Sequence, residues 1–273
     1  IHFIDFKNPD LVIKKIIRSS ISDLICKGVK PKYYFISGSG NKRSFTKKNL
    51  ELISKSLHQE QKKYSIYLCG GDTSFSKKLS FTITSVGFSD KIVFRNKAKL
   101  NDDIYVTGNL GDSFIGLKVL QKKINLNLNL TRYFRNKYFH PNLHINFTKK
   151  LLSIANTSID ISDGLVADLE KLINNQKLSY ELYLNKIPIS KNLNKLINLK
   201  IIQKIKSVTQ GDDYQILFTA LPSKSRIISK ISKSLGIRIS KIGKICNHNQ
   251  KSQIINEKNK KIALKNKGYF HRF

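Results

Sequence analysis

The stretch from Thr157 to Asp168 (TSIDISDGLVAD) gathers the residue types in this sequence that are best suited to chemistry. Isoleucines alternate there with Asp160 and Ser162, and this period-two pattern predicts a half-buried strand with the carboxylate and the hydroxyl on one face. Asp163-Gly164 indicates a turn, and apolar residues from Leu165 onward follow at helical spacing. A helix N-terminus favours anions, and carboxylates beside an anion site suggest a Mg²⁺ ion that bridges protein and phosphate. The alternative is that Ser162 or Asp163 only caps the helix.

Acids recur at other turns. Asp72 follows Gly70-Gly71, where a backbone without side chains can pass close to a ligand, although a simple hairpin turn is the alternative. Asp212 and Asp213 are adjacent, so each raises the proton affinity of the other unless cations or donors stabilise them; solvated loop acids are the alternative. Asp23 falls late in a predicted helix, where an acid opposes the helix dipole and needs solvent or a partner.

The net charge of +32 arises from 50 Lys and Arg against 18 Asp and Glu. The excess is spread along the whole chain and no nucleic-acid motif accompanies it, so we expect no nucleic-acid partner and regard the clustered acids as the informative feature. No apolar run approaches the length of a membrane span, and we expect no membrane partner. The cysteines, Cys26, Cys69 and Cys246, lack metal-ligand or redox spacing and predict free thiols in a reducing cytoplasm.

Hydrophobic periodicity predicts the elements that must position these acids. Helices are expected at 10–28, 48–61, 112–120, 147–155, 165–173 and 222–236. Strands are expected at 32–37, 65–72, 79–88, 104–108, 159–162, 180–184, 215–220 and 237–246, with residues 1–7 as the tail of a further strand. Segment 38–44 is glycine-rich but lacks the spacing of a phosphate-binding loop, and from residue 248 a basic hairpin or tail is expected.

The acidic turns, in this order, resemble the thiamine-monophosphate kinase family, which belongs to the superfamily of aminoimidazole ribonucleotide synthetase and selenophosphate synthetase. The resemblance covers essentially the whole chain. The matching segments are HF at 2–3, SDL at 22–24, GGDT at 70–73, RxxAK at 95–99, VTGxxGDS at 106–113, DISDGL at 160–165, GDDY at 211–214 and GYxH at 268–271.

This resemblance implies that the γ-phosphoryl group of ATP is transferred in line to thiamine monophosphate, giving thiamine diphosphate without a phospho-enzyme. Carried over by position, the implied Mg²⁺ ligands are Asp23, Asp72 and Asp160, with Asp163 serving a further Mg²⁺. The implied ATP contacts are Gly71, Asp72, Arg95 and Ser162. The implied contacts to thiamine monophosphate are His2, Asp212 and Tyr269.

The resemblance further implies a two-domain α/β protein that forms a homodimer by pairing its N-terminal sheets. An α+β domain at 1–94, truncated at its start, is expected to precede an α/β domain at 95–273. The acidic strand and Thr-Asp pair that the family carries before His2 are absent, so several Mg²⁺ ligands are expected to be missing. Asp212 replaces the usual glutamate, and His144 stands where arginine is frequent.

Two alternatives stay open on the sequence. In the first alternative, the chain is another ATP-using member of the superfamily, such as a selenophosphate or aminoimidazole ribonucleotide synthetase. Otherwise it is a non-catalytic basic protein that binds RNA, in which case binding would depend steeply on salt concentration.

Overall fold

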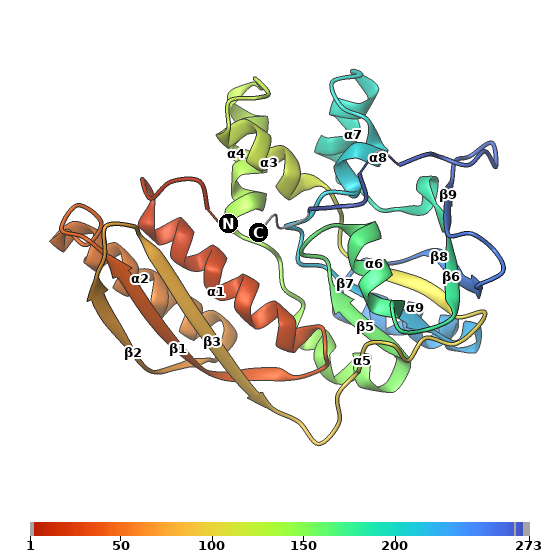
Figure 1. Ribbon diagram of the computed structural model, residues 1–273, viewed down its shortest axis with the longest axis horizontal. Helices are drawn as coiled ribbons and strands as arrows, with labels where there is room; N and C mark the ends of the chain where they lie inside the picture. Colours follow the sequence, from red (N-terminus) through yellow and green to blue (C-terminus); the bar gives the residue numbers. More distant parts are fainter. Residues whose placement is uncertain (1–2, 265, 270–273) are drawn as a thin grey trace.

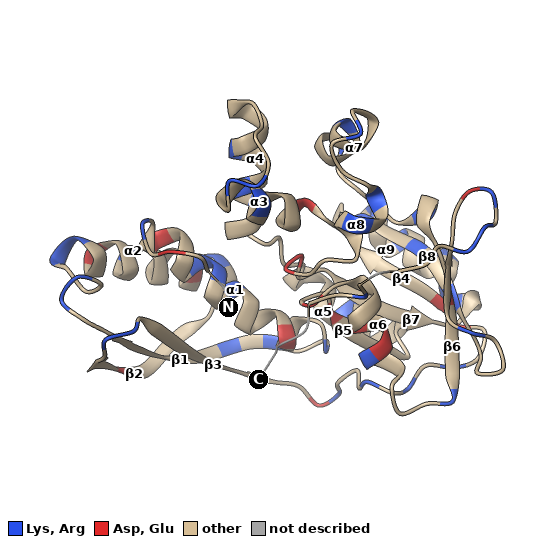
Figure 2. Ribbon diagram, turned by 45° about the horizontal axis from the view of Figure 1, so that its top comes forward, with Lys and Arg blue, Asp and Glu red and all other residues tan. Residues whose placement is uncertain are grey.

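The first half of the chain builds a three-stranded sheet covered on one face by two helices. The computed structural model describes residues 3–264 and 266–269. Its first elements are α1 (Pro9–Ile25), β1 (Lys30–Gly40), α2 (Lys47–Tyr64), β2 (Tyr67–Phe75) and β3 (Ser80–Phe88). The strand order is β2-β1-β3, with β2 parallel and β3 antiparallel to β1. Helices α1 and α2 lie on the same side of this sheet, and among the described residues nothing covers its other face (Figures 1 and 2).

The second half builds a six-stranded sheet in the order β5-β7-β4-β8-β6-β9. Its strands are β4 (Asp103–Thr107), β5 (Thr157–Asp160), β6 (Leu178–Tyr183), β7 (Ile216–Ala220), β8 (Ile239–Asn247) and β9 (Gln253–Ile255). All neighbouring strands are antiparallel except β6 and β9. Every residue of β4, β5 and β7 is buried, so these three neighbouring strands lie in the interior of the molecule.

Helices pack around this second sheet. They are α3 (Asp112–Leu120), α4 (Leu128–Phe139), α5 (Thr148–Ile154), α6 (Leu165–Ile173), α7 (Lys191–Asn198), α8 (Lys204–Val208) and α9 (Ser225–Leu235). Short 3-10 turns occur at η1 (Ile145–Phe147), η2 (Leu184–Lys186) and η3 (Pro222–Lys224). Helices α3 and α4 lie side by side above the junction between the two sheets (Figure 1).

Helix α1 joins the two halves into one packed body. Its buried residues recur at helical spacing, because one stripe faces the three-stranded sheet while another faces the second half. The largest core cluster therefore contains residues of α1 and β1 together with residues of α4, α5, β7 and α9. The C-terminal end of α1 packs against β5, which brings Asp23 towards the end of the strand that carries Asp160.

The observed elements confirm most of the predicted ones, and α6 occupies the predicted residues 165–173. The strand expected at residues 1–7 is wrong for the described residues 3–7, which form bends and irregular backbone. The central strand begins two residues earlier than predicted and ends at Asp160, so Ser162 lies in the turn and not on the strand. Helices α7 and α8 lie in a segment that the periodicity left unassigned. The domain boundary expected at residues 94 and 95 falls between β3 and β4, and the division into domains stays a prediction.

The paired glycines Gly70 and Gly71 lie inside strand β2, so the hairpin-turn alternative is wrong. Strands β2 and β3 do not pair with each other; both pair with β1. A Cβ atom at Gly71 would lie 1.7 Å from the carbonyl oxygen of Ile36, so the neighbouring strand itself requires glycine at this position.

Candidate active site

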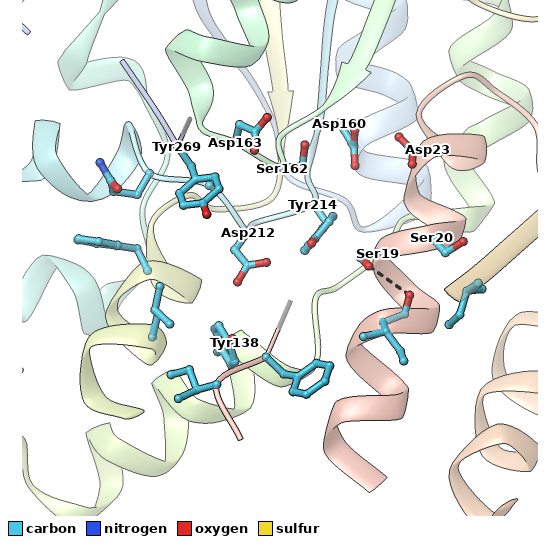
Figure 3. Close-up of a pocket in the computed structure, with 18 of the residues that line it drawn as sticks. Ser19, Ser20, Asp23, Tyr138, Asp160, Ser162, Asp163, Asp212, Tyr214 and Tyr269 are labelled. Carbon is cyan, nitrogen blue, oxygen red and sulfur yellow. Dashed lines mark hydrogen bonds between the residues drawn. The ribbon is translucent and has the colours of Figure 1, made fainter. Parts of the chain in front are cut away.

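A cavity of about 820 Å³ opens between α1, β3, α3, α4 and the two acidic loops of the second half. Its acidic and hydroxyl-bearing lining residues are Ser19, Ser20, Asp23, Asp160, Ser162, Asp163 and Asp212. Its apolar and aromatic lining residues include Phe3, Phe114, Leu117, Tyr138, Tyr214 and Tyr269. Figure 3 shows Asp23, Asp160 and Asp163 along one side, Tyr138 on the opposite side, and Asp212 between them. The cavity thus has an acidic part and an aromatic part.

Asp23 and Asp160 meet at the acidic part because α1 packs against β5. The hydroxyl of Ser22 donates a hydrogen bond of 2.8 Å to Asp160 Oδ2. Burial, reinforced by the charge of Asp23 and opposed by the Ser22 hydrogen bond, raises the pKa of Asp160 to about 7. Burial also raises the pKa of Asp23, although the positive charges of Lys27 and Arg95 oppose this shift. Both pKa values are raised, so the acidic part of the cavity favours a proton or a cation on these two carboxylates.

The turn after β5 is organised by Asp168, which lies in the first turn of α6. Asp168 Oδ2 accepts hydrogen bonds from the backbone N–H groups of residues 162, 163 and 164, at 2.9, 2.8 and 3.0 Å. Lys171 donates to Asp168 Oδ1 at 3.0 Å and also forms an ion pair with Asp163. The N–H groups of this turn therefore point to a buried carboxylate of the protein itself, and the Asp163 side chain is already paired with a cation.

The second acidic loop packs directly on this turn. The backbone N–H of Asp212 donates to the carbonyl oxygen of Ser162 at 2.8 Å, and that of Tyr214 donates to Ile161 at 2.8 Å. A Cβ atom at Gly211 would lie 1.9 Å from the Ser162 carbonyl oxygen, so this close approach requires glycine. Asp212 itself adopts a positive φ of 76°. Its carboxylate forms an ion pair with Lys15 of α1.

Tyr269 is half-exposed at the rim of the cavity. Its backbone N–H donates to the carbonyl oxygen of Asp163 at 2.8 Å, which fixes the C-terminal segment beside the acidic turn. Figure 3 shows its ring beside Asp212. The structure therefore brings six sequence-predicted residues to one cavity: Asp23, Asp160, Ser162, Asp163, Asp212 and Tyr269.

The other predicted residues lie elsewhere. Gly71 and Asp72 are on β2, and two strand spacings, about 10 Å, separate β2 from β3, whose Phe81 lines the cavity. Asp72 Oδ1 accepts from the backbone N–H of Thr73 at 2.7 Å. Arg95 is exposed outside the cavity, although its charge acts on Asp23. His2 lies outside the described residues. The roles expected for these four residues stay predictions.

Three residues of the site were missed by the sequence reasoning. Lys15 falls on the buried face of α1 among Val12 and Ile16, and a lysine at such a position is the signal that could have revealed it. Asp168 and Lys171 belong to the predicted helix, but no sequence pattern shows that they bond to the preceding turn. Those bonds depend on the path of the backbone between β5 and α6.

The oxygen atoms at the acidic part suit a hard cation, since carboxylate and hydroxyl oxygens are the ligands that Mg²⁺ prefers. Among the described residues, no three His, Cys, Asp or Glu side chains converge into a ready-made metal cage. Mg²⁺ usually takes one or two protein carboxylates and completes its shell with water and phosphate oxygens. Asp23 and Asp160 fit one such shared site, and Asp163, which is paired with Lys171, lies on the same side of the cavity and suits a further ion.

The acidic part contrasts with the rest of the surface. Figure 2 shows Lys and Arg on most helices and on several strands and loops, without a single basic stripe.

Within residues 3–264 and 266–269, no helix combines the length and the apolar character needed to cross a membrane.

Known proteins share both the sequence and the fold. Residues 1–89 match the family described as AIR synthase related protein, N-terminal domain. Over 274 residues the chain is 35% identical to the thiamine-monophosphate kinase of Buchnera aphidicola subsp. Schizaphis graminum, covering 99% of this chain and 83% of that protein. The crystal structure of thiamine monophosphate kinase from Aquifex aeolicus matches with a TM-score of 0.82 at 26% identity, over 96% of this chain and 85% of that one. A structure described as AaThiL complexed with AMPPCP and TMP matches with a TM-score of 0.85 at 26% identity, over 99% and 84%. The predicted α/β fold class of the aminoimidazole ribonucleotide synthetase type is confirmed.

Proposed function

This chain belongs to the thiamine-monophosphate kinase family, and on that premise we propose that its cavity transfers the γ-phosphoryl group of ATP to the phosphate of thiamine monophosphate, yielding thiamine diphosphate. One observation carries the proposal. Asp23 comes from α1, whereas Asp160 and Asp163 come from the end of β5 and the turn after it, and all three share one side of a cavity whose opposite side is aromatic. The AMPPCP and TMP in the matching structure, an ATP analogue and the product's precursor, agree with this assignment.

The acidic part is the proposed place for the reacting phosphates. Asp23, Asp160 and Asp163 would hold Mg²⁺, which neutralises phosphate charge during transfer. Ser22 keeps Asp160 oriented through its hydrogen bond, and Asp168 keeps the 162–164 turn in shape. These contacts fix the acids before any ligand arrives, and phosphoryl transfer depends mainly on such positioning.

The aromatic part is the proposed place for the thiamine rings. Phe114, Tyr138 and Tyr269 line it. Lys15 already lies against the ring of Tyr138, so the half-exposed ring of Tyr269 is the aromatic face best placed to attract a cationic ring such as the thiazolium of thiamine. Asp212 lies between the two parts, so it can contact the rings of the substrate where they enter the aromatic part. The direct in-line reaction expected for the family needs no side-chain nucleophile in this arrangement.

We infer that two copies of the chain pair through the uncovered face of the three-stranded sheet. Tyr33 lies with its ring centre 6.4 Å from that of Tyr67 and 6.2 Å from that of Phe88, so aromatic rings cross all three strands. Phe35, Tyr67, Phe75 and Phe88 are exposed. A contiguous apolar surface beside an open edge strand is typical of an interface. In sedimentation experiments Phe88→Glu should shift the protein to monomers, whereas Leu128→Glu, at an exposed residue of α4, should leave the dimer intact; a monomeric wild type would refute the pairing.

The remaining expectations belong to the same proposal. Gly71 and Asp72 lie on the edge strand of this proposed interface, so their expected nucleotide contacts are best tested in the dimer. The chain's three cysteines are free, which supports a reducing compartment and hence the cytoplasm.

The direct test is an assay of the purified chain with ATP, Mg²⁺ and thiamine monophosphate, in which thiamine diphosphate is measured by conversion to its fluorescent thiochrome. We expect product only when both substrates are present. Glu51→Gln, a change at an exposed acid of α2, should retain full activity as a control for acid-to-amide substitution. A folded, dimeric protein that forms no thiamine diphosphate would contradict the proposed function.

A further inference from the structure

Lys15 is a fully buried amine directly behind the wall of the cavity. Its side chain is 0% exposed, forms an ion pair with Asp212, and lies with Nζ 3.1 Å from the ring centre of Tyr138. An ammonium group removed from water is costly unless its partners compensate, and here a carboxylate and an aromatic face do so. Lys15 therefore connects α1 to the second acidic loop and to α4, at the point where the acidic and aromatic parts of the cavity meet.

The carboxylate of Asp212 is held on several sides. Its backbone is fixed by the hydrogen bond to Ser162 and by the packing of Gly211 on the same turn. Its carboxylate accepts from Lys15, and burial together with the charge of Asp212 raises the pKa of the neighbouring Tyr214 hydroxyl. With 22% of its side chain exposed, Asp212 presents part of a fixed carboxylate to the cavity.

Lys15 supplies the counter-charge of the Asp212 carboxylate. Burial lowers the pKa of Lys15 to about 8, and the charge of Asp212 opposes that shift, so Lys15 keeps its charge near neutral pH. Without Lys15, Asp212 would lie in a partly buried site near Asp160 with no counter-charge. The carboxylate would lose the ion pair that holds it in place, and the cavity would lose a fixed acceptor.

We propose that Lys15 is a positioning residue for thiamine monophosphate, holding Asp212 as the acceptor for the amino group on the pyrimidine ring. This inference rests on the proposed function and names the part of the substrate that the site recognises. The amino group carries the only N–H donors of thiamine monophosphate, and a fixed carboxylate is an acceptor that favours it. Lys15 acts through Asp212 and touches no reacting atom.

The test compares thiamine monophosphate with oxythiamine monophosphate, in which an oxygen replaces the amino group. A site that hydrogen-bonds a substrate N–H rejects an analogue without it, so the wild type should prefer thiamine monophosphate by roughly tenfold or more in kcat/KM. In Lys15→Met and in Asp212→Asn this preference should fall towards unity, through a higher KM for thiamine monophosphate, while the KM for ATP changes by less than about threefold. Lys14→Met, the same substitution at the neighbouring residue, should keep the wild-type preference. An unchanged preference in Lys15→Met would overturn the positioning role.

Two further measurements separate this role from folding and from the proposed function. The Lys15→Met/Asp212→Asn double variant removes both charges together, and its preference and KM should equal those of Asp212→Asn alone. A further loss of about tenfold in the double variant would show that Lys15 acts independently of Asp212, and would overturn the inference. Calorimetry of the wild type with thiamine monophosphate tests whether the proposed function itself fails. No binding and no product would reject the proposed function together with the inference, whereas an active wild type with an unaltered Lys15→Met variant rejects the inference alone.

Discussion

Ser22 and Asp160, 138 residues apart in the chain, are joined by a buried hydrogen bond of 2.8 Å. Ser22 lies near the end of α1, and Asp160 is the last residue of β5. The bond fixes Asp160 beside Asp23, the residue that follows Ser22. One hydrogen bond between the two halves of the molecule therefore sets the geometry of the acidic part of the cavity.

Asp160→Asn should reduce kcat by roughly a hundredfold or more, because the site would lose a charged group at the place where phosphate charge must be stabilised. The amide keeps the size of the side chain and can still accept from Ser22. Activity should be measured by thiamine diphosphate formation over a range of Mg²⁺ concentrations. Unchanged turnover at limiting Mg²⁺ would reject the role of Asp160 as a ligand, and Glu51→Gln serves as the control.

Lys171→Met should lower the Mg²⁺ concentration needed for half-maximal activity by about two- to fivefold, the worth of a partly exposed ion pair. Lys171 pairs with Asp163 and Asp168, so it competes with a metal ion for the Asp163 carboxylate. Binding of Mn²⁺, followed by electron paramagnetic resonance without substrates, should tighten in the same variant. Lys177→Met, which changes a lysine beyond the end of α6, should have no effect, and weaker Mn²⁺ binding in Lys171→Met would speak against competition.

Glu60→Gln should destabilise the protein by about 3–5 kcal/mol, because it leaves the buried guanidinium of Arg18 without a counter-charge. Arg18 Nε and Nη2 each donate to a Glu60 carboxylate oxygen at 2.7 Å, and both side chains are almost fully buried. Urea unfolding is the measurement. The Arg18→Met/Glu60→Leu double variant should recover most of the loss. A loss below about 1 kcal/mol in Glu60→Gln would show that this pair contributes no more than an exposed one.

The stability of the protein should fall as pH is lowered from about 6.5 to about 4 through the titration of His140. Burial, with the nearby charges of Arg18 and Lys14, lowers the pKa of His140 to about 4 from an ordinary 6.5. The unfolded chain therefore binds more protons than the folded chain across this window, and the folded state loses stability as pH falls. Thermal unfolding of His140→Gln should show a smaller drop within the window than the wild type. His58→Gln, at an exposed histidine of α2, should behave as the wild type, and equal drops in all three proteins would exclude His140.

Much of the candidate site could be predicted because its acids are few and lie in turns with a recognisable order. Asp160, Ser162 and Asp163 lie at the end of β5 or just after it, and Asp212 lies just before β7. The apolar patterns of both strands are visible in the sequence, so these places at strand ends were predictable. Gly71 shows the limit of such reasoning. Its glycine suggested a ligand, but the carbonyl oxygen of Ile36 on the neighbouring strand is what excludes a side chain there.

By itself, the sequence determined most of the helices and strands, the acidic turns and the family, since these depend on local periodicity and on short motifs. Only the tertiary structure decided which acids share a cavity and which cations pair with them. Lys15 meets Asp212 across 197 residues, and Lys171 turns back to Asp163 from the next helix. Such pairings depend on how α1 packs against the second half and on where each backbone turn ends. The sequence pattern does not show which distant residues come together. Burial and charge compensation therefore appear only in the folded chain.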